Sequence, residues 1–328
     1  MEQRTLGSTG RDVSVIGLGT WQLGADWGAV DEADARAVLE ASVEAGVTFF
    51  DTADVYGDGR SEQVIGRFLA ETGAPVTVAT KMGRRGDQVA ANYTLDHFRA
   101  WADRSRANLQ RDTLDLVQLH CPPTDVIEAQ RTYDDLETLR SEGAIAAYGV
   151  SVETCAQALA AIERGAATIQ IIINAFRLKP LDEVLPVARE KGVGIIVRVP
   201  LASGLLSGRY TTHTTFAPDD HRTFNRHGEA FDQGETFSGV DFETGVAAAQ
   251  EFAALARAAA PDATTAQVAL AWLAQQPGVT TVIPGARNVD QARANAAAGS
   301  LSPLGDAFDA DVHRLYDARF RAAVHGRW

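Results

Sequence analysis

Four side chains of complementary chemistry stand at or just after three successive apolar runs. They are Asp51 at the end of VTFFD, Tyr56 in DTADVYG, Lys81 at the end of VATK and His120 at the end of LVQLH. A phenol has an ordinary pKa of about 10 and holds its proton firmly at neutral pH. A neighbouring ammonium favours the phenolate, and a neighbouring imidazole can bond to the proton or relay it. With a carboxylate to keep the lysine charged and oriented, the set predicts a general acid that protonates a substrate oxygen.

Each of these residues taken alone has a simpler explanation. A tyrosine in a loop rich in glycine and aspartate is usually a surface residue, and an aspartate there can cap a helix. A lone lysine or histidine after a buried strand usually reaches solvent or donates a structural hydrogen bond. The chemical interpretation therefore depends on the elements that bring the four side chains to one rim.

One pattern recurs along the chain and supplies those elements. A helical stretch ends with an acidic residue near a glycine, as in Glu44-Ala45-Gly46 and Glu190-Lys191-Gly192, and an apolar run follows. Glycine suits the left-handed position that ends a helix. Runs that are apolar on successive residues are typical of parallel strands covered on both faces. Eight such strands are predicted, within 13–19, 47–51, 75–81, 115–120, 144–150, 166–173, 193–199 and 281–285.

Helical windows alternate with these strands. They lie near 31–44, 61–70, 94–110, 132–141, 153–163, 182–190 and 264–275, and capping boxes are predicted at Thr264 with Gln267 and at Asn288 with Gln291. Eight strand-helix repeats in 328 residues favour an α/β fold of the (β/α)8 TIM barrel type, in a single domain over 1–328. An open dinucleotide-binding sheet is disfavoured, because Gly17-Leu18-Gly19 lacks the third glycine of that fingerprint.

Two segments stand outside the repeat. Thr5-Leu6 and Val13 flank the turn Gly7-Ser8-Thr9-Gly10, which predicts an N-terminal β-hairpin that plugs the bottom of the barrel. After the seventh strand, residues 209–239 are polar and rich in glycine, histidine and phenylalanine. A loop of this length predicts a lid or a binding loop.

Bulk properties exclude several classes of protein. A net charge of −13, from 30 basic and 43 acidic residues, argues against nucleic-acid binding. The absence of an apolar run of about 18 residues argues against a membrane span. Two cysteines, Cys121 and Cys155, and a start without a signal-peptide pattern predict a cytoplasmic protein. No metal is expected, because the spacings of His213, His221 and His227 suit no usual zinc site.

Several separated motifs, in the right order on successive strands, resemble the aldo-keto reductase family. They are GVTFFDTADVYGDGRSE (46–62), VATKMG (78–83), LDLVQLH (114–120), YGVS (148–151) and VIPGARN (282–288). The resemblance covers nearly the whole chain and implies NADPH-dependent reduction of aldehydes or ketones by a monomer or small homo-oligomer. It implies that Tyr56 is the proton donor, that Lys81 and Asp51 tune it, and that His120 orients the substrate carbonyl.

The same resemblance implies a set of cofactor and substrate contacts. Gly19, Thr20 and Trp21 match the nicotinamide side, Ser151 and Gln170 the carboxamide, Pro200, Leu201, Ser203, Gly204 and Gly208 the pyrophosphate, and Gly285, Arg287, Gln291 and Asn295 the adenosine end. The substrate pocket is assigned to Trp21, Trp27 and Met82. Because a guanidinium pairs bidentately with phosphate, Arg287 favours NADPH over NADH.

Three positions depart from the family pattern. Val152 stands where many members have asparagine, and Gly285 stands where some carry a lysine for the 2′-phosphate. Arg198 stands where many members stack an aromatic ring on the nicotinamide. A guanidinium can also stack and is therefore counted among the cofactor contacts, but it changes the local charge.

Two other functions compete with this prediction. The first is a non-catalytic NADPH-binding regulatory subunit of the same fold, and the complete set of four catalytic residues argues against it. The second is a Schiff-base aldolase that uses Lys81. An imine-forming lysine needs a lowered pKa, whereas a nearby Asp51 raises it.

Overall fold

The architecture is a barrel of eight parallel strands, as predicted. In a computed structural model that describes residues 1–24 and 31–328, each strand pairs with the next one along the chain, in the order β10-β9-β8-β7-β6-β5-β4-β3. Parallel bridges from Ile16 to Val282 and from Gly19 to Gly285 join the first strand to the last. The strands are β3 (Leu18–Gly19), β4 (Phe49–Asp51), β5 (Thr77–Met82), β6 (Leu116–His120), β7 (Tyr148–Ser151), β8 (Thr168–Ile172), β9 (Gly194–Arg198) and β10 (Thr281–Val282).

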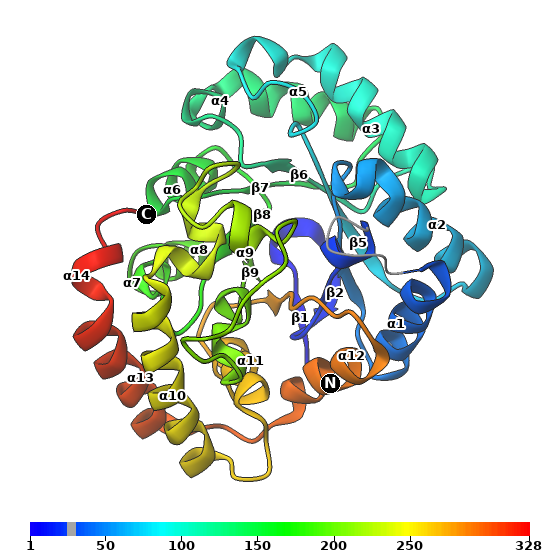
Figure 1. The fold of residues 1–328 in the computed structure, drawn as a ribbon. Helices are drawn as coiled ribbons and strands as arrows, with labels where there is room; N and C mark the ends of the chain where they lie inside the picture. The colour runs from blue at the N-terminus through cyan, green and yellow to red at the C-terminus, as the bar shows by residue number, and fades with distance from the viewer. Residues whose placement is uncertain (25–30) are drawn as a thin grey trace.

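Helices surround the strands on the outside (Figure 1). The main ones are α1 (Glu32–Glu44), α2 (Arg60–Thr72), α3 (Leu95–Leu109), α4 (Thr124–Glu128), α5 (Gln130–Ser141), α6 (Cys155–Glu163), α7 (Lys179–Glu183), α8 (Leu185–Lys191), α10 (Phe242–Ala259), α11 (Thr265–Ala274), α12 (Val289–Ala297), α13 (Gly305–Arg319) and α14 (Arg321–Val324). Helix α10 lies outside the predicted windows because the connection between the seventh and eighth strands is longer than one repeat. No helix in the described residues is long and apolar enough to cross a membrane.

The two predicted capping boxes have different outcomes. At Thr264 both reciprocal bonds with Gln267 are present, so this box is confirmed. At Asn288 the side chain accepts the Gln291 N–H. The Gln291 side chain, however, accepts from the Arg287 N–H at 2.8 Å, so the second box is only half formed.

The N-terminal hairpin closes the bottom of the barrel, which confirms the predicted plug. Strands β1 (Gln3–Thr5) and β2 (Asp12–Ser14) pair antiparallel. Leu6 and Val13 are fully buried in one cluster with inward-facing strand residues. At Gly7, where φ is +55°, a Cβ would lie 2.1 Å from the Ala167 carbonyl oxygen, so only glycine allows this approach.

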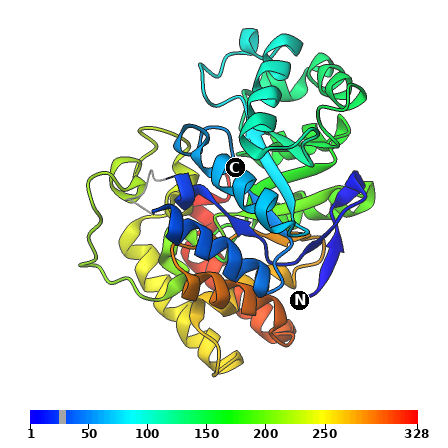
Figure 2. The ribbon, with the colours of Figure 1, turned by 90° about the vertical axis from the view of Figure 1, so that its right-hand side faces the viewer.

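The long segment after the seventh strand is folded and lies at the other end of the barrel from the hairpin (Figure 2). It contains the short helices α9 (His221–Phe224), η6 (Gln233–Glu235) and η7 (Phe237–Gly239). An aromatic cluster holds it to the start of α10, with the rings of Phe237 and Phe242 5.1 Å apart. Arg222 covers one face of this cluster, with its guanidinium carbon 4.3 Å from the Phe216 ring centre.

Candidate active site

The four predicted catalytic side chains meet at the carboxyl ends of neighbouring strands. The Lys81 ammonium donates to Asp51 Oδ2 at 2.5 Å, to the Thr52 carbonyl at 3.0 Å and to Tyr56 Oη at 3.4 Å. The Tyr56 ring meets the His120 ring edge-on, with centroids 6.0 Å apart. These contacts arise because β4, β5 and β6 are adjacent and parallel, so their carboxyl ends reach the same rim.

The lysine and the tyrosine share a buried ion-pair environment. Burial disfavours the charge of Lys81, but the Asp51 carboxylate and the Tyr56 oxygen raise the pKa of Lys81 overall. Burial raises the pKa of Tyr56, and the Lys81 ammonium opposes this rise. The sequence predicted only the effect of the ammonium on the phenol, and in the structure burial has the larger effect on the pKa of Tyr56. Tyr56 therefore holds its proton in this state, as a proton donor must before it reacts.

The histidine is neutral. Burial, followed by the positive charges of Arg84, Lys81 and Arg198, holds the pKa of His120 well below its ordinary value. His120 Nε2 lies 3.4 Å from an Arg84 nitrogen, and because a guanidinium has only donors, Nε2 accepts in this assignment. A neutral imidazole can orient a carbonyl without competing with Tyr56 as the acid.

A network of amides behind the lysine supports its carboxylate. Gln170 Nε2 donates to Asp51 Oδ1 at 2.7 Å, and Gln118 Nε2 donates to the same oxygen at 3.2 Å. The Gln170 carbonyl oxygen lies 3.5 Å from Ser151 Oγ. Ser151 and Gln170 are therefore adjacent, as the prediction of a shared carboxamide site requires. Gln118 was not predicted, although it is two residues before His120 on the same strand and so faces the same side.

A pocket of about 770 Å³ opens beside these groups. Its lining includes Tyr56, His120 and the predicted Trp21, whose ring centre is 6.1 Å from that of Tyr56. The assignment of Met82 to the pocket is wrong. Its side chain is 1% exposed in the hydrophobic core, because successive strand residues point to opposite faces and Lys81 takes the inner one. Trp27, also assigned to the pocket, lies outside the described residues.

Two arginines and two glutamates form a charge cluster in the wall of this pocket. Arg198 contacts Glu153 at 3.0 Å and Glu235 at 3.5 Å, and Arg84 contacts Glu235 at 3.3 Å. Burial opposes ionisation of Glu235, but Arg198 and Arg84 lower the pKa of Glu235 to about 2. Burial and the charge of Glu235 raise the pKa of Glu153. The arginine at the family's ring-stacking position is thus fixed by carboxylates from two other elements.

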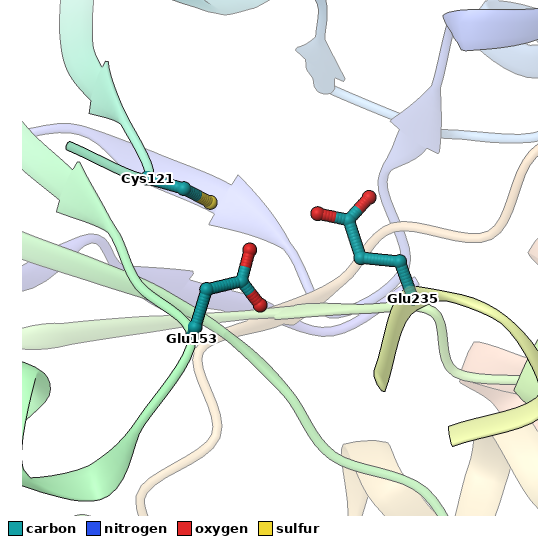
Figure 3. A group of neighbouring side chains, drawn as sticks. All are labelled: Cys121, Glu153 and Glu235. Atoms are coloured by element: carbon teal, nitrogen blue, oxygen red, sulfur yellow. The ribbon is translucent and has the colours of Figure 1, made fainter. Parts of the chain in front are cut away.

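Cys121, Glu153 and Glu235 come close enough to suggest a metal site (Figure 3). Arg198 explains their approach without a metal. Its Nη2 lies 3.6 Å from Cys121 Sγ and 3.0 Å from Glu153, and its Nη1 lies 3.5 Å from Glu235. The guanidinium already supplies the positive charge that draws the three groups together.

The predicted pyrophosphate segment lies against the long loop. Ser203 Oγ donates to the Glu235 carbonyl at 3.1 Å and accepts from the Phe237 N–H at 3.0 Å. Ser203 and Gly204 have positive φ values of 54° and 95° within η5 (Ala202–Ser207), so the backbone turns sharply here. The neighbouring predicted residues Pro200, Leu201 and Gly208 border this turn.

The predicted adenosine segment is braced at the start of α12. Asn295 Nδ2 donates to the Gly285 carbonyl at 3.1 Å. A Cβ on Gly285 would lie 2.3 Å from the Gln22 side chain, so the strand end and the first loop approach closely here. Arg287 is exposed just before the helix, and Gln291 accepts from its backbone N–H. Next to this segment on the rim, Gly19 bridges to Gly285, and Thr20 Oγ1 donates to the Asp51 carbonyl at 2.8 Å.

A model of the aldo/keto reductase family matches residues 15–317, which is nearly the whole barrel. The chain belongs to the aldo/keto reductase family. Aldo-keto reductase YhdN of Bacillus subtilis is 30% identical over 304 residues, covering 90% of this chain and 87% of that protein. A probable voltage-gated potassium channel subunit beta of Arabidopsis thaliana is 26% identical over 328 residues, covering 93% of each.

Solved structures of this family share the whole architecture. A glycerol dehydrogenase from Gluconobacter oxydans superposes with a TM-score of 0.79 at 28% identity, covering 97% of this chain and 95% of that chain. An aldo-keto reductase from Klebsiella pneumoniae, determined in complex with NADPH, superposes with a TM-score of 0.72 at 25% identity and covers 96% of each chain. The chain therefore has the barrel fold of the aldo-keto reductases, and it is an oxidoreductase of this family.

Sequence reasoning missed Arg84, Glu153 and Glu235. Arg84 and Glu153 each follow the end of a strand by two residues, and that position was a usable signal in a barrel. Glu235 had no comparable signal. It reaches the site only because the long loop folds back over the rim.

Proposed function

We propose that the protein is an NADPH-dependent oxidoreductase that reduces aldehydes or ketones to alcohols, with Tyr56 as the general acid. The observation that carries this proposal is the position of the Lys81 ammonium between Asp51 Oδ2, at 2.5 Å, and Tyr56 Oη, at 3.4 Å. A phenol that lines a pocket and contacts a buried ammonium is the arrangement that proton transfer to a bound substrate requires.

The four residues divide the work of one proton transfer. The substrate carbonyl oxygen binds between Tyr56 Oη and the His120 ring, which lie in the lining of the same pocket. NADPH, when bound, supplies the hydride to the carbonyl carbon. Tyr56 gives its proton to the developing alkoxide, and the Lys81 ammonium stabilises the phenolate that remains. Asp51 keeps the ammonium in place and balances its charge.

Other residues of the rim fit this cofactor. Ser151 and Gln170 offer neighbouring hydrogen-bonding groups for a carboxamide, and the turn at Ser203-Gly204 lets backbone approach phosphate oxygens. Arg287, before the N-terminus of α12, suits a 2′-phosphate. The related Klebsiella structure is a complex with NADPH, which supports the same choice.

Steady-state NADPH oxidation by the wild-type protein with a panel of uncharged aldehydes and ketones tests the proposal. We expect turnover with at least some aldehydes, and tight NADPH binding with no turnover of any carbonyl would contradict the enzyme. That result would favour the alternative of a non-catalytic NADPH-binding regulatory subunit, and one relative of this chain is a probable voltage-gated potassium channel subunit beta. A Schiff-base role for Lys81 is disfavoured, because its neighbours raise the pKa that an imine-forming amine must lower.

We also propose that the chain acts as one barrel domain on small-molecule carbonyl substrates, in the cytoplasm. The location is inferred from the scarcity of cysteine. The catalytic site lies within one chain, so a monomer is sufficient for the proposed reaction.

A further inference from the structure

The last residue of the chain, Trp328, is buried against the long loop that roofs the active site. Its side chain is 7% exposed, and its indole N–H donates to Asp232 Oδ1 at 3.1 Å. The guanidinium carbon of the buried Arg177 lies 4.3 Å from the centre of the indole ring. A ring fixed by a hydrogen bond at its edge and by a cation on its face has a single orientation.

The loop is shaped to receive this ring. At Gly239, where φ is +69°, a Cβ would lie 2.2 Å from the Trp328 ring. At Gly234 a Cβ would lie 3.0 Å from the same ring. Gly234 in η6 and Gly239 in η7, which precede and follow Glu235 in the sequence, thus leave room for the indole ring. A second contact is made next door, where Arg327 donates to the Gln233 side chain at 3.2 Å.

Glu235 connects this anchored segment to the catalytic group. Its side chain is 10% exposed and contacts Arg84 at 3.3 Å and Arg198 at 3.5 Å. Arg84 in turn lies 3.4 Å from His120 Nε2. A continuous series of contacts therefore runs from Trp328 through the 232–239 segment and Glu235 to Arg84 and the substrate side of His120.

The charge that Glu235 neutralises decides which substrates this wall accepts. Arg84 is the cation among the described pocket-lining residues, and the acidic ones are Asp87, Glu153, Asp232 and Glu235. With Glu235 in contact, Arg84 is paired, so an anionic substrate meets mainly carboxylates. Without that contact, Arg84 keeps only the more distant Glu153 carboxylate at 3.9 Å, and its guanidinium beside His120 can pair with a substrate carboxylate or phosphate.

We propose that Trp328 is a positioning residue that holds Glu235 against Arg84, and that this contact makes the active site favour uncharged over anionic carbonyl substrates. The inference rests on the proposed reductase function. It assigns a specificity role to a residue that lies outside the pocket lining.

Two benzaldehydes that differ in charge provide the test, with NADPH as the reductant. 4-Nitrobenzaldehyde is uncharged, and 4-carboxybenzaldehyde carries a carboxylate at neutral pH. The quantity measured is the ratio of kcat/KM for the neutral aldehyde to that for the anionic one. We expect Glu235→Gln to lower this ratio about tenfold, because one charge within a few ångströms of the bound carboxylate is removed. Trp328→Ala should lower it by a similar factor, and the double variant should lower it no further than either single one.

Trp272 offers a matched control. It is also a buried indole, its N–H donates to the Asp309 carboxylate at 2.9 Å, and neither residue lines the pocket. Trp328→Phe and Trp272→Phe each remove one indole–carboxylate hydrogen bond. Trp328→Phe should lower the ratio part of the way, whereas Trp272→Phe should leave it unchanged. A general loss of stability would affect both aldehydes equally and would not move the ratio.

Three results would overturn the inference. They are an unchanged ratio in Trp328→Ala, effects of Trp328→Ala and Glu235→Gln that multiply in the double variant, and unchanged amide hydrogen exchange over 233–239 in Trp328→Ala. Faster exchange in that segment is the expected result and needs no substrate. If the wild-type protein reduced neither aldehyde, the proposed function would fail, and hydrogen exchange would still decide whether Trp328 anchors the segment.

Discussion

Asp54 is a buried carboxyl group, and its replacement by asparagine should change how stability depends on pH. Asp54 is 1% exposed, and neither carboxyl oxygen of Asp54 has a hydrogen-bond partner within the described part of the chain. Burial and the nearby Glu62 carboxylate raise the pKa of Asp54 from 3.8 to about 7. The folded protein therefore keeps a proton on Asp54 at pH values where the unfolded chain has lost it.

The direction of the effect follows from proton linkage. Because the folded-state pKa is raised, the folded state binds more protons than the unfolded state between pH 3.8 and about 7. The contribution of Asp54 to the free energy of unfolding therefore falls as the pH rises from 3.8 to about 7, and it is constant at higher pH. Between pH 5 and pH 8 the loss is about 2–3 kcal/mol for pKa values of 3.8 and about 7. Asp54→Asn removes this dependence.

Urea unfolding of the wild-type protein and of Asp54→Asn at about pH 5, 6, 7 and 8 measures the effect. These pH values cover the range in which the folded protein loses the Asp54 proton. The free energy of unfolding of the variant minus that of the wild type should rise by about 2–3 kcal/mol from pH 5 to pH 8. Any pH-independent cost of burying the amide cancels in this comparison. Asp96→Asn, at a side chain that is 94% exposed, is the control and should show no rise. A flat difference for Asp54→Asn would refute the claim that this carboxyl is buried and protonated.

Two further predictions test the ends of the barrel. Arg287→Ala should weaken NADPH binding by about tenfold or more while changing NADH binding less than about twofold, because a charge-assisted bond to the 2′-phosphate is lost. Fluorescence titration with both cofactors measures this, and an equal loss for the two would place the 2′-phosphate elsewhere. Leu6→Ala should lower the free energy of unfolding by about 2–5 kcal/mol, because it opens a cavity where the fully buried Leu6 side chain packs under the barrel. The same variant should leave the dissociation constant of NADPH unchanged, since the plug and the cofactor site lie at opposite ends, and weakened binding would contradict that separation.

The sequence was sufficient for the barrel because its signals are local and repeated. Each strand is an apolar run, and each run ends where a chemically active residue can stand on the rim. The error at Met82 was avoidable, since placing Lys81 inside the barrel already places the next residue outside it. The partial failure at Asn288 is of another kind, because Gln291 had two backbone N–H groups within reach and only the folded loop selects between them.

The rest of the site depends on contacts between distant parts of the chain. Glu235 meets Arg198 only because a loop of about thirty residues folds over the rim. The direction of the Tyr56 pKa shift depends on how deeply the phenol is buried, and burial is a property of the assembled pocket. The sequence alone predicts neither the charge cluster of Arg84, Glu153, Arg198 and Glu235 nor whether burial or the Lys81 charge has the larger effect on the pKa of Tyr56.

The central claim is that Tyr56 gives up the proton that accompanies hydride transfer. The most direct test is the single-turnover rate of NADPH oxidation by Tyr56→Phe, with the NADPH dissociation constant measured on the same preparation. The rate should fall by about 10²–10⁴-fold while the dissociation constant changes less than about twofold. A rate equal to that of the wild-type protein, at unchanged NADPH affinity, would show that the proton comes from another group.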